Sequence, residues 1–264
     1  MLRDRVELPA DVLTTVLRWE GIDRPHTVLA VTALWMDDDT RREVDRKVLA
    51  ELANRGLADG RGVDAGFRAT MGAIARPAVE FYGWISTGPD MTGVLAVASG
   101  SEAVLIIRHD ETVTLYAARP DSLAEAVVAQ LPAVPPAHGR SLNVPETDLS
   151  GARPAQDSDE GFAGFGSQTG PSTDVKLFNT LMNEPRTATS QLYVAVRDGL
   201  GRRVRATHNL SVIDVAPGRS AEGRWMTQEA TNGAGGNWVY AAPANPQALT
   251  AKLYEMVRAL SGVR

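Results

Sequence analysis

The chain has 264 residues, of which 44% are hydrophobic and 22% charged, a balance typical of a protein with a buried core. Its formal net charge is −5, whereas nucleic-acid-binding proteins usually carry a basic excess, so we expect no nucleic-acid partner. The apolar runs are too short to cross a bilayer and the N-terminus has no apolar signal core, which predicts a cytoplasmic protein without membrane insertion. The absence of cysteine excludes disulfides, thiolate zinc sites and thiol catalysis.

The first half of the chain reads as helices followed by consecutive strands. A strand is expected at 6–8, a helix from Pro9 to about Gly21, a strand at 27–31, and helices at about 40–56 and 64–75. The helices are indicated by apolar residues spaced three and four apart, the strands by alternation. Further strands are predicted at 79–85, 93–98, 103–108 and 112–116, followed by a helix at 122–131. Strands joined by short turns favour an antiparallel meander.

The second half begins after a stretch with few apolar anchors. Residues 132–145 are rich in proline and 146–173 in Gly, Ser, Asp and Pro, so we expect a long flexible linker over 132–172. A helix at 173–182 should lead into a hairpin of strands 187–196 and 202–214, turning at Asp198–Gly201. The segment Gly223–Met226, a last strand at 237–240 and a helix at 246–260 complete the chain.

A short internal repeat relates the two halves. Tyr116-Ala-Ala and Tyr240-Ala-Ala each end a predicted strand, and a proline and a predicted helix follow both. Two related strand-and-helix halves, at 1–131 and 173–264, would explain the repeat. The order of strands and helices therefore predicts an α+β fold with two related halves joined by the linker.

The sequence offers no catalytic or metal-binding constellation. The four histidines are scattered without metal-ligand spacing, and no Gly-Lys-Ser/Thr sequence is present. Gly166-Ser-Gln-Thr-Gly170 resembles a nucleophile elbow but lacks a preceding strand. Arg202, Arg203 and Arg205 lie beside a hairpin turn and are interpreted as a solvent-facing edge cluster. We expect no cofactor, no metal and no enzymatic activity.

Large apolar side chains in or beside the predicted strands favour a function in protein binding. Trp84, Trp225, Met226 and Trp238 lie in or beside predicted strands, and Met91 lies in a predicted turn. Such residues are usually core, but an antiparallel sheet can present one face outward, and large apolar groups exposed there would mark a partner site.

Several segments, in order along nearly the whole chain, resemble the EspG family. They are Val6-Glu-Leu-Pro-Ala-Asp-Val-Leu with Trp19, Leu52-Ala-Asn-Arg-Gly-Leu57, Ile74-Ala-Arg-Pro77, Gly201-Arg-Arg-Val-Arg205, Val212-Ile-Asp214, Gly223-Arg-Trp225 and the Tyr240 strand with its helix. The resemblance implies a single domain, 1–264, in which one central antiparallel sheet is flanked by helical bundles in two pseudo-symmetric halves. It also implies a cytosolic, substrate-specific chaperone of actinobacterial type VII secretion that binds and solubilises helical PE–PPE-like heterodimers.

The family's partner surface uses the sheet face, the loop between the first two long strands and the C-terminal helical part. Carried over to this chain, the resemblance implies a partner site formed by Trp84, Ser86, Gly88, Asp90, Met91, Trp225 and Met226. Two other readings stay open. One is an enzyme, such as a hydrolase, whose dispersed site converges only in three dimensions; the other is a structural subunit that forms a homodimer through its sheet.

Overall fold

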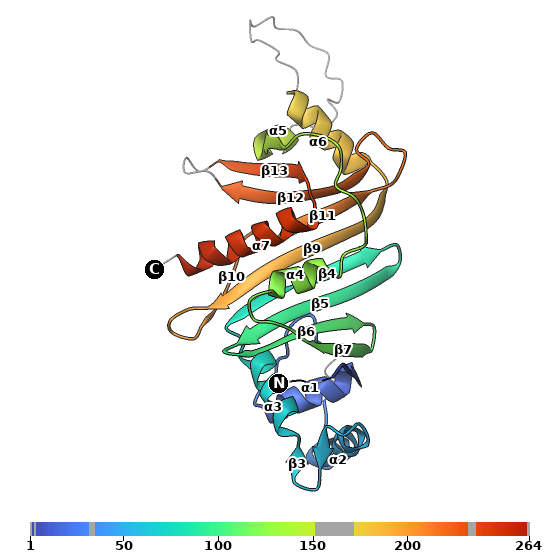
Figure 1. Cartoon of the computed structure of the whole chain (residues 1–264), viewed down its shortest axis with the longest axis vertical. Coiled ribbons are helices and arrows are strands. Elements are labelled where there is room, and N and C mark those ends of the chain that lie inside the picture. Colours follow the sequence, from blue (N-terminus) through green and yellow to red (C-terminus); the bar gives the residue numbers. More distant parts are fainter. Residues whose placement is uncertain (1, 3, 32–34, 151–171, 232–235, 263–264) are drawn as a thin grey trace, which may run out of the picture.

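The computed structural model describes residues 2, 4–31, 35–150, 172–231 and 236–262. Within these residues eleven strands form one sheet in the order β1-β7-β6-β5-β4-β9-β11-β12-β13-β8, with β10 added beside β9 (Figure 1). The strands are β1 (Val6–Pro9), β4 (Val79–Thr87), β5 (Asp90–Ser99), β6 (Glu102–His109), β7 (Thr112–Ala117), β8 (Leu142–Pro145), β9 (Arg186–Arg197), β10 (Arg203–Arg205), β11 (Leu210–Val215), β12 (Gly223–Thr231) and β13 (Asn237–Pro243). Every pair of neighbouring strands is antiparallel.

Seven helices and a small hairpin complete the described elements. The helices are α1 (Ala10–Trp19), α2 (Asp38–Asn54), α3 (Ala65–Ala75), α4 (Leu123–Val128), α5 (Glu146–Ser150), α6 (Thr173–Asn183) and α7 (Pro246–Ser261). The hairpin pairs β2 (Ala58–Asp59) with β3 (Gly62–Val63). Polar caps start the longer helices: the side chains of Asp37, Asp64, Ser172 and Asn245 each accept a hydrogen bond from a backbone N–H of the first turn.

The two halves of the chain share one topology, as the sequence repeat predicted. In the first half β1 and the helices α1 to α3 precede β4 to β7 and α4; in the second, β8, α5 and α6 precede β9 to β13 and α7. In each half the opening strand pairs with the last one, β1 with β7 and β8 with β13. Tyr116 and Tyr240 lie in β7 and β13, the strands that precede α4 and α7.

The halves meet where β4 pairs with β9, with Tyr82 opposite Tyr193. The two backbones approach so closely here that a Cβ on Gly83 would lie 2.0 Å from the carbonyl oxygen of Gln191. Only glycine permits this approach, so the joint between the halves depends on one residue without a side chain.

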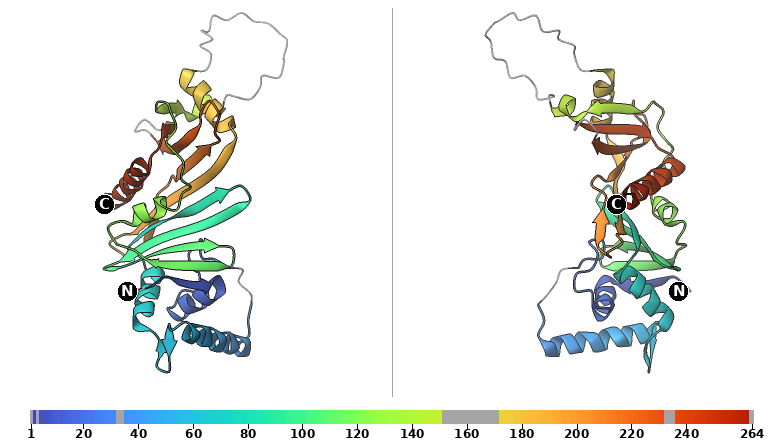
Figure 2. Two further views of the ribbon diagram at one scale, coloured as in Figure 1. Left: turned by 45° about the vertical axis from the view of Figure 1, so that its right-hand side comes forward. Right: turned by 90° about the vertical axis from the view of Figure 1, so that its left-hand side faces the viewer.

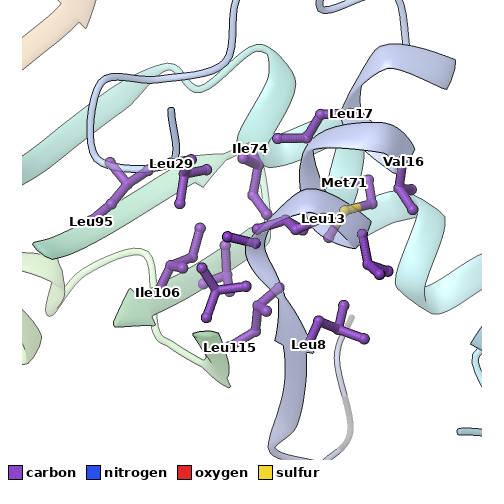
Figure 3. Packing of buried hydrophobic residues seen from close by; sticks show 14 of the residues in the cluster. Leu8, Leu13, Val16, Leu17, Leu29, Met71, Ile74, Leu95, Ile106 and Leu115 are labelled. Carbon is purple, nitrogen blue, oxygen red and sulfur yellow. The ribbon is translucent and has the colours of Figure 1, made fainter. Parts of the chain in front are cut away.

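Three hydrophobic clusters divide the two faces of the sheet. On one face α1, α2 and α3 pack on the first half around Leu13, Leu17 and Met71 (Figure 3). On the same face α6 packs on the second half, over Ile213 and Trp225. The opposite face carries α4 and α7, which pack together over Phe81, Val94 and Val194 (Figure 2).

Part of the expected linker is folded. Residues 142–145 form the edge strand β8, and 146–150 form α5. The proline-rich segment before them is held by Arg224, whose backbone bonds Pro135 and Ala137 and whose guanidinium bonds the carbonyl of Pro132 and the buried carboxylate of Asp214. Proline has no backbone N–H, but its carbonyl oxygen still accepts hydrogen bonds. Donors from a neighbouring strand can therefore hold a proline-rich segment in place. Residues 151–171 lie outside the described residues.

Three other predicted elements differ from the structure. Residues 27–31 form a turn instead of a strand, because Val28 packs against Gly93 and Arg108 bonds the carbonyl oxygens of Val28 and Ala30. The strand predicted at 202–214 is divided into β10 and β11. The helix predicted at 122–131 is shorter, ending at Val128.

Candidate partner-binding groove

A groove runs along β4 and β9 on the sheet face that carries α1 to α3 at one end and α6 at the other. It consists of two hollows of about 500 and 720 Å³ that share Trp84. The C-terminal part of β9 lines the first hollow through Tyr193 and Arg197, and the N-terminal part lines the second through Arg186 and Gln191. Among the described elements, α4 and α7 cover the opposite face, and no helix crosses the middle of this one (Figure 2).

The first hollow, here called the arginine hollow, is lined by the sheet, α3 and the segment after α1. Its lining comprises Leu17, Ile22, Arg24, Pro25, His26, Thr27, Ile74, Ala75, Pro77, Glu80, Tyr82, Trp84, Leu95, Val97, Tyr193, Arg197, Arg203 and Arg205. The second, here called the methionine hollow, lies between β4, β9, β11 and α6. It is lined by Trp84, Ser86, Met91, Met182, Arg186, Thr189, Ser190, Gln191, Ser211, Val212, Ile213 and Thr227.

Aromatic rings form the floor where the two hollows meet. Tyr82 and Tyr193 stack with their ring centroids 5.3 Å apart, and Trp84 meets Tyr193 edge to face at 6.0 Å. Tyr82 is buried, while Trp84 and Tyr193 are half-buried and present ring surface to the groove. Packing fixes the rings before any partner arrives, so binding to them costs little side-chain entropy.

A buried ion pair closes the base of the arginine hollow. Glu80 is 2% exposed and accepts hydrogen bonds from Nε and Nη2 of Arg203 at 2.7 to 3.0 Å. Burial opposes the charge on Arg203, but the hydrogen bonds and charge attraction from Glu80 and Tyr82 together outweigh it, and the pKa of the guanidinium is raised. Because the guanidinium bonds both carboxylate oxygens, the buried Glu80 has a charged partner.

His26 packs against this ion pair in its neutral form. Burial, reinforced by the charge of Arg203, lowers the pKa of His26 from 6.5 to about 4. Its Nδ1 accepts a hydrogen bond from the backbone N–H of Val28, and its Nε2 lies 3.5 Å from a carboxylate oxygen of Glu80 and 3.4 Å from Nη2 of Arg203. The ring also meets Tyr82 edge to face at 4.4 Å.

Three of the residues expected at the partner site lie in the groove. Trp84 joins the two hollows, and Ser86 and Met91, which are paired across β4 and β5, line the methionine hollow. Met91 is 59% exposed, unusual for a large apolar side chain in a strand.

The expected loop between the first two long strands is instead a tight turn. Thr87 pairs with Asp90, which leaves only Gly88 and Pro89 unpaired, and Gly88 takes a left-handed φ of 62°. Gly88 and Asp90 are exposed but line neither hollow.

The structure contradicts an exposed position for Trp225 and Met226. Trp225 is 5% exposed, packs in the cluster beneath α6 and donates its indole N–H to the carbonyl oxygen of Ala221 at 2.9 Å. Met226, 9% exposed, points to the opposite face and packs with the cluster of α4 and α7. Successive strand residues face opposite sides, so these two could not have shared one surface.

Sequence reasoning missed several groove residues, among them Tyr82, Tyr193 and Met182. Tyr82 and Tyr193 come together because β4 pairs with β9, more than a hundred positions away, and neither strand's own pattern specifies that pairing. Met182 reaches the groove from α6. His208 lines neither hollow and contacts the exposed Glu229 at 3.2 Å. No group of His, Asp and Glu residues suited to a metal ion occurs in the described parts of the chain. Over the same residues, no helix has the length and apolar character needed to span a membrane.

Comparison with known families matches the EspG family over residues 9–255. The chain belongs to the EspG family. Among solved structures, the type VII secretion system chaperone EspG5 of Mycobacterium tuberculosis, determined in complex with the PE25–PPE41 dimer, is similar in fold. The TM-score is 0.66 at 15% sequence identity, over 96% of each chain. No curated protein matched. The match confirms the predicted family and fold for this EspG member.

Proposed function

We propose that this protein is a substrate-specific chaperone of type VII secretion that binds helical PE–PPE-like export substrates in the groove along β4 and β9. The family assignment and the fold shared with EspG5, which was determined with a PE–PPE dimer, support the class of partner. The observation that carries the proposal is the groove itself, where Trp84 and the exposed Met91 and Met182 lie on an open sheet face.

The shape of the groove suits a protein partner. It is a long depression lined by side chains from both halves of the chain, and methionines adapt readily to irregular apolar surfaces. Burial of a client's apolar surface supplies the binding free energy, so binding and solubilisation require no nucleotide. A specific complex of this kind buries on the order of 1,200–2,000 Å² in total.

Co-expression with the helical secreted proteins encoded nearby, followed by size-exclusion chromatography, tests the proposal. A stoichiometric, soluble complex is expected, with clients that precipitate when expressed alone. If the clients are equally soluble alone and none co-elutes, the proposal is wrong.

Two matched variants locate the binding surface. Met182→Gln removes an apolar side chain, 39% exposed, from the rim of the methionine hollow, whereas Leu49→Gln makes the same kind of change at a residue 40% exposed on α2. Only Met182→Gln should weaken the complex. Trp84→Ala should weaken it by roughly 30-fold, the effect of losing an anchor of about 2 kcal/mol, while the fold is retained. Equal affinities for the Met182 and Leu49 variants would place the client elsewhere.

A further inference from the structure

The charges lining the groove are strongly unbalanced. Five arginines line the two hollows (Arg24, Arg186, Arg197, Arg203 and Arg205), and Glu80 is the one acidic side chain among the lining residues that the structure describes. The whole chain has a net charge of −5, so positive charge is concentrated here against the overall balance. A concave surface with one sign of charge attracts groups of the opposite sign.

Most of these arginines are already engaged. Arg203 is held by Glu80, Arg197 donates to the carbonyl oxygens of Pro77 and Gly201, and Arg186 donates to that of Met182. Their donors fix the strands and the hairpin, so these three residues have mainly structural roles.

Arg205 and Arg24 differ from the other three. Within the described parts of the chain, no carboxylate lies within ion-pair distance of either side chain. Both residues are exposed at the arginine hollow. The guanidinium of Arg205 lies over the ring of Tyr193, 5.7 Å from its centroid. Stacking of this kind orients the planar group while leaving its N–H donors free for a carboxylate.

The ring contacts give the spacing between this free charge and the aromatic floor. The guanidinium of Arg205 lies 5.7 Å from the ring centroid of Tyr193, and that centroid lies 6.0 Å from the ring centroid of Trp84. Side chains seven residues apart on a helix share one face and lie about 10 Å apart along its axis, which matches this separation.

We propose that the arginine hollow, through Arg205 and Arg24, binds an acidic side chain on the client helix, about seven residues, or two helical turns, from the apolar side chain that packs on Trp84. This inference rests on the proposed chaperone function and adds a charge requirement to it. Apolar burial on Trp84 and the methionines supplies affinity, and the carboxylate selects which helix binds and in which register.

Synthetic peptides test the charge requirement without a known client. Each is an amphipathic helix of about 20 residues with one Phe anchor and, about seven residues away in either direction, a Glu or a Gln; a third places the Glu about three residues from the anchor. Fluorescence anisotropy measures binding to the full chain. We expect the peptide with Glu two turns from Phe to bind about ten-fold more tightly than the other two at low salt. The preference should disappear at about 0.5 M salt, where screening is strong.

Arg205→Gln should abolish the preference without reducing the affinity for the Gln peptide. Arg61→Gln is the matched control, because Arg61 is an exposed arginine in the β2–β3 hairpin and lines neither hollow. Equal binding of the Glu and Gln peptides, or no binding of either, overturns the inference. Displacement of the Glu peptide by an equimolar single-stranded oligonucleotide would also overturn it, since nucleic acid would then be the preferred occupant.

The outcomes separate this inference from the proposed function. A helical heterodimer that co-elutes with the chain but binds Arg205→Gln as tightly as the unmodified protein would leave the chaperone function intact and refute the acidic contact. A clear preference for the Glu peptide without any co-eluting heterodimer would support the arginine site and refute the chaperone function.

Discussion

Protonation of His26 should destabilise the folded protein as the pH falls below neutrality. His26 is neutral in the fold, where Glu80, Arg203 and Tyr82 are the ionisable groups that face it. A proton on Nδ1 would place two N–H donors against each other, because this nitrogen accepts from the N–H of Val28. Protonation of His26 therefore breaks this hydrogen bond and destabilises the folded state.

The sign and size of the effect follow from the pKa. Folding lowers the pKa of His26 from 6.5 to about 4, so between these values the unfolded chain binds more protons than the folded one. The stability contributed by neutral His26 is fully present above pH 6.5 and is lost as the pH falls from 6.5 toward 4. Between pH 7.5 and 5 the loss amounts to roughly 2 kcal/mol.

Urea unfolding of the unmodified protein and His26→Asn at pH 7.5 and pH 5 measures this contribution. Asn retains an acceptor for the Val28 N–H but cannot be protonated. Between the two pH values the variant should therefore lose about 2 kcal/mol less stability than the unmodified protein loses. His109→Asn, at an exposed histidine, should behave like the unmodified protein. Identical pH dependence for the unmodified protein and His26→Asn would refute the reasoning.

Three further predictions concern residues that hold the sheet together, each measured by urea unfolding. Trp225→Ala should cost about 3–5 kcal/mol, because the indole fills the cluster beneath α6; a loss under 1 kcal/mol would mean that it is not core. Asp214→Ala should cost about 3–5 kcal/mol by leaving Arg224 buried and unpaired, whereas Thr92→Ala should have little effect. Gly83→Ala should cost at least 1–3 kcal/mol, since its Cβ would meet the backbone of Gln191; unchanged stability would contradict the close β4–β9 approach.

Local patterns in the sequence predicted most of the individual elements. Alternation identified β4 to β7 and β9, and apolar spacing identified the longer helices, because each pattern reflects a buried face within one element. The Tyr-Ala-Ala repeat correctly related β7 to β13, although β13 continues past the repeated residues to Pro243. Where prediction failed, at 27–31 and 142–150, distant partners decided the outcome: Arg108 holds the first segment, and pairing with β13 holds the second.

The groove was predicted only in part. Trp84 and Met91 were selected as large apolar residues near strands, and both line it. Trp225 was chosen by the same criterion and is buried, since residue type alone does not tell which face α6 covers. The roles of Arg203 and Arg205 differ although the residues are two apart: Arg203 turns inward to Glu80, and Arg205 lies over Tyr193. Such a distinction requires the tertiary structure.

The two outermost strands of the sheet end alike. β1 (Val-Glu-Leu-Pro) and β8 (Leu-Asn-Val-Pro) are four residues long, and each finishes at a proline, which has no N–H to offer a further strand. Short edge strands of this kind resist edge-to-edge pairing of one sheet with another, which is the first step toward fibrous aggregates. Self-association of this protein through the edges of its sheet would have to overcome this barrier.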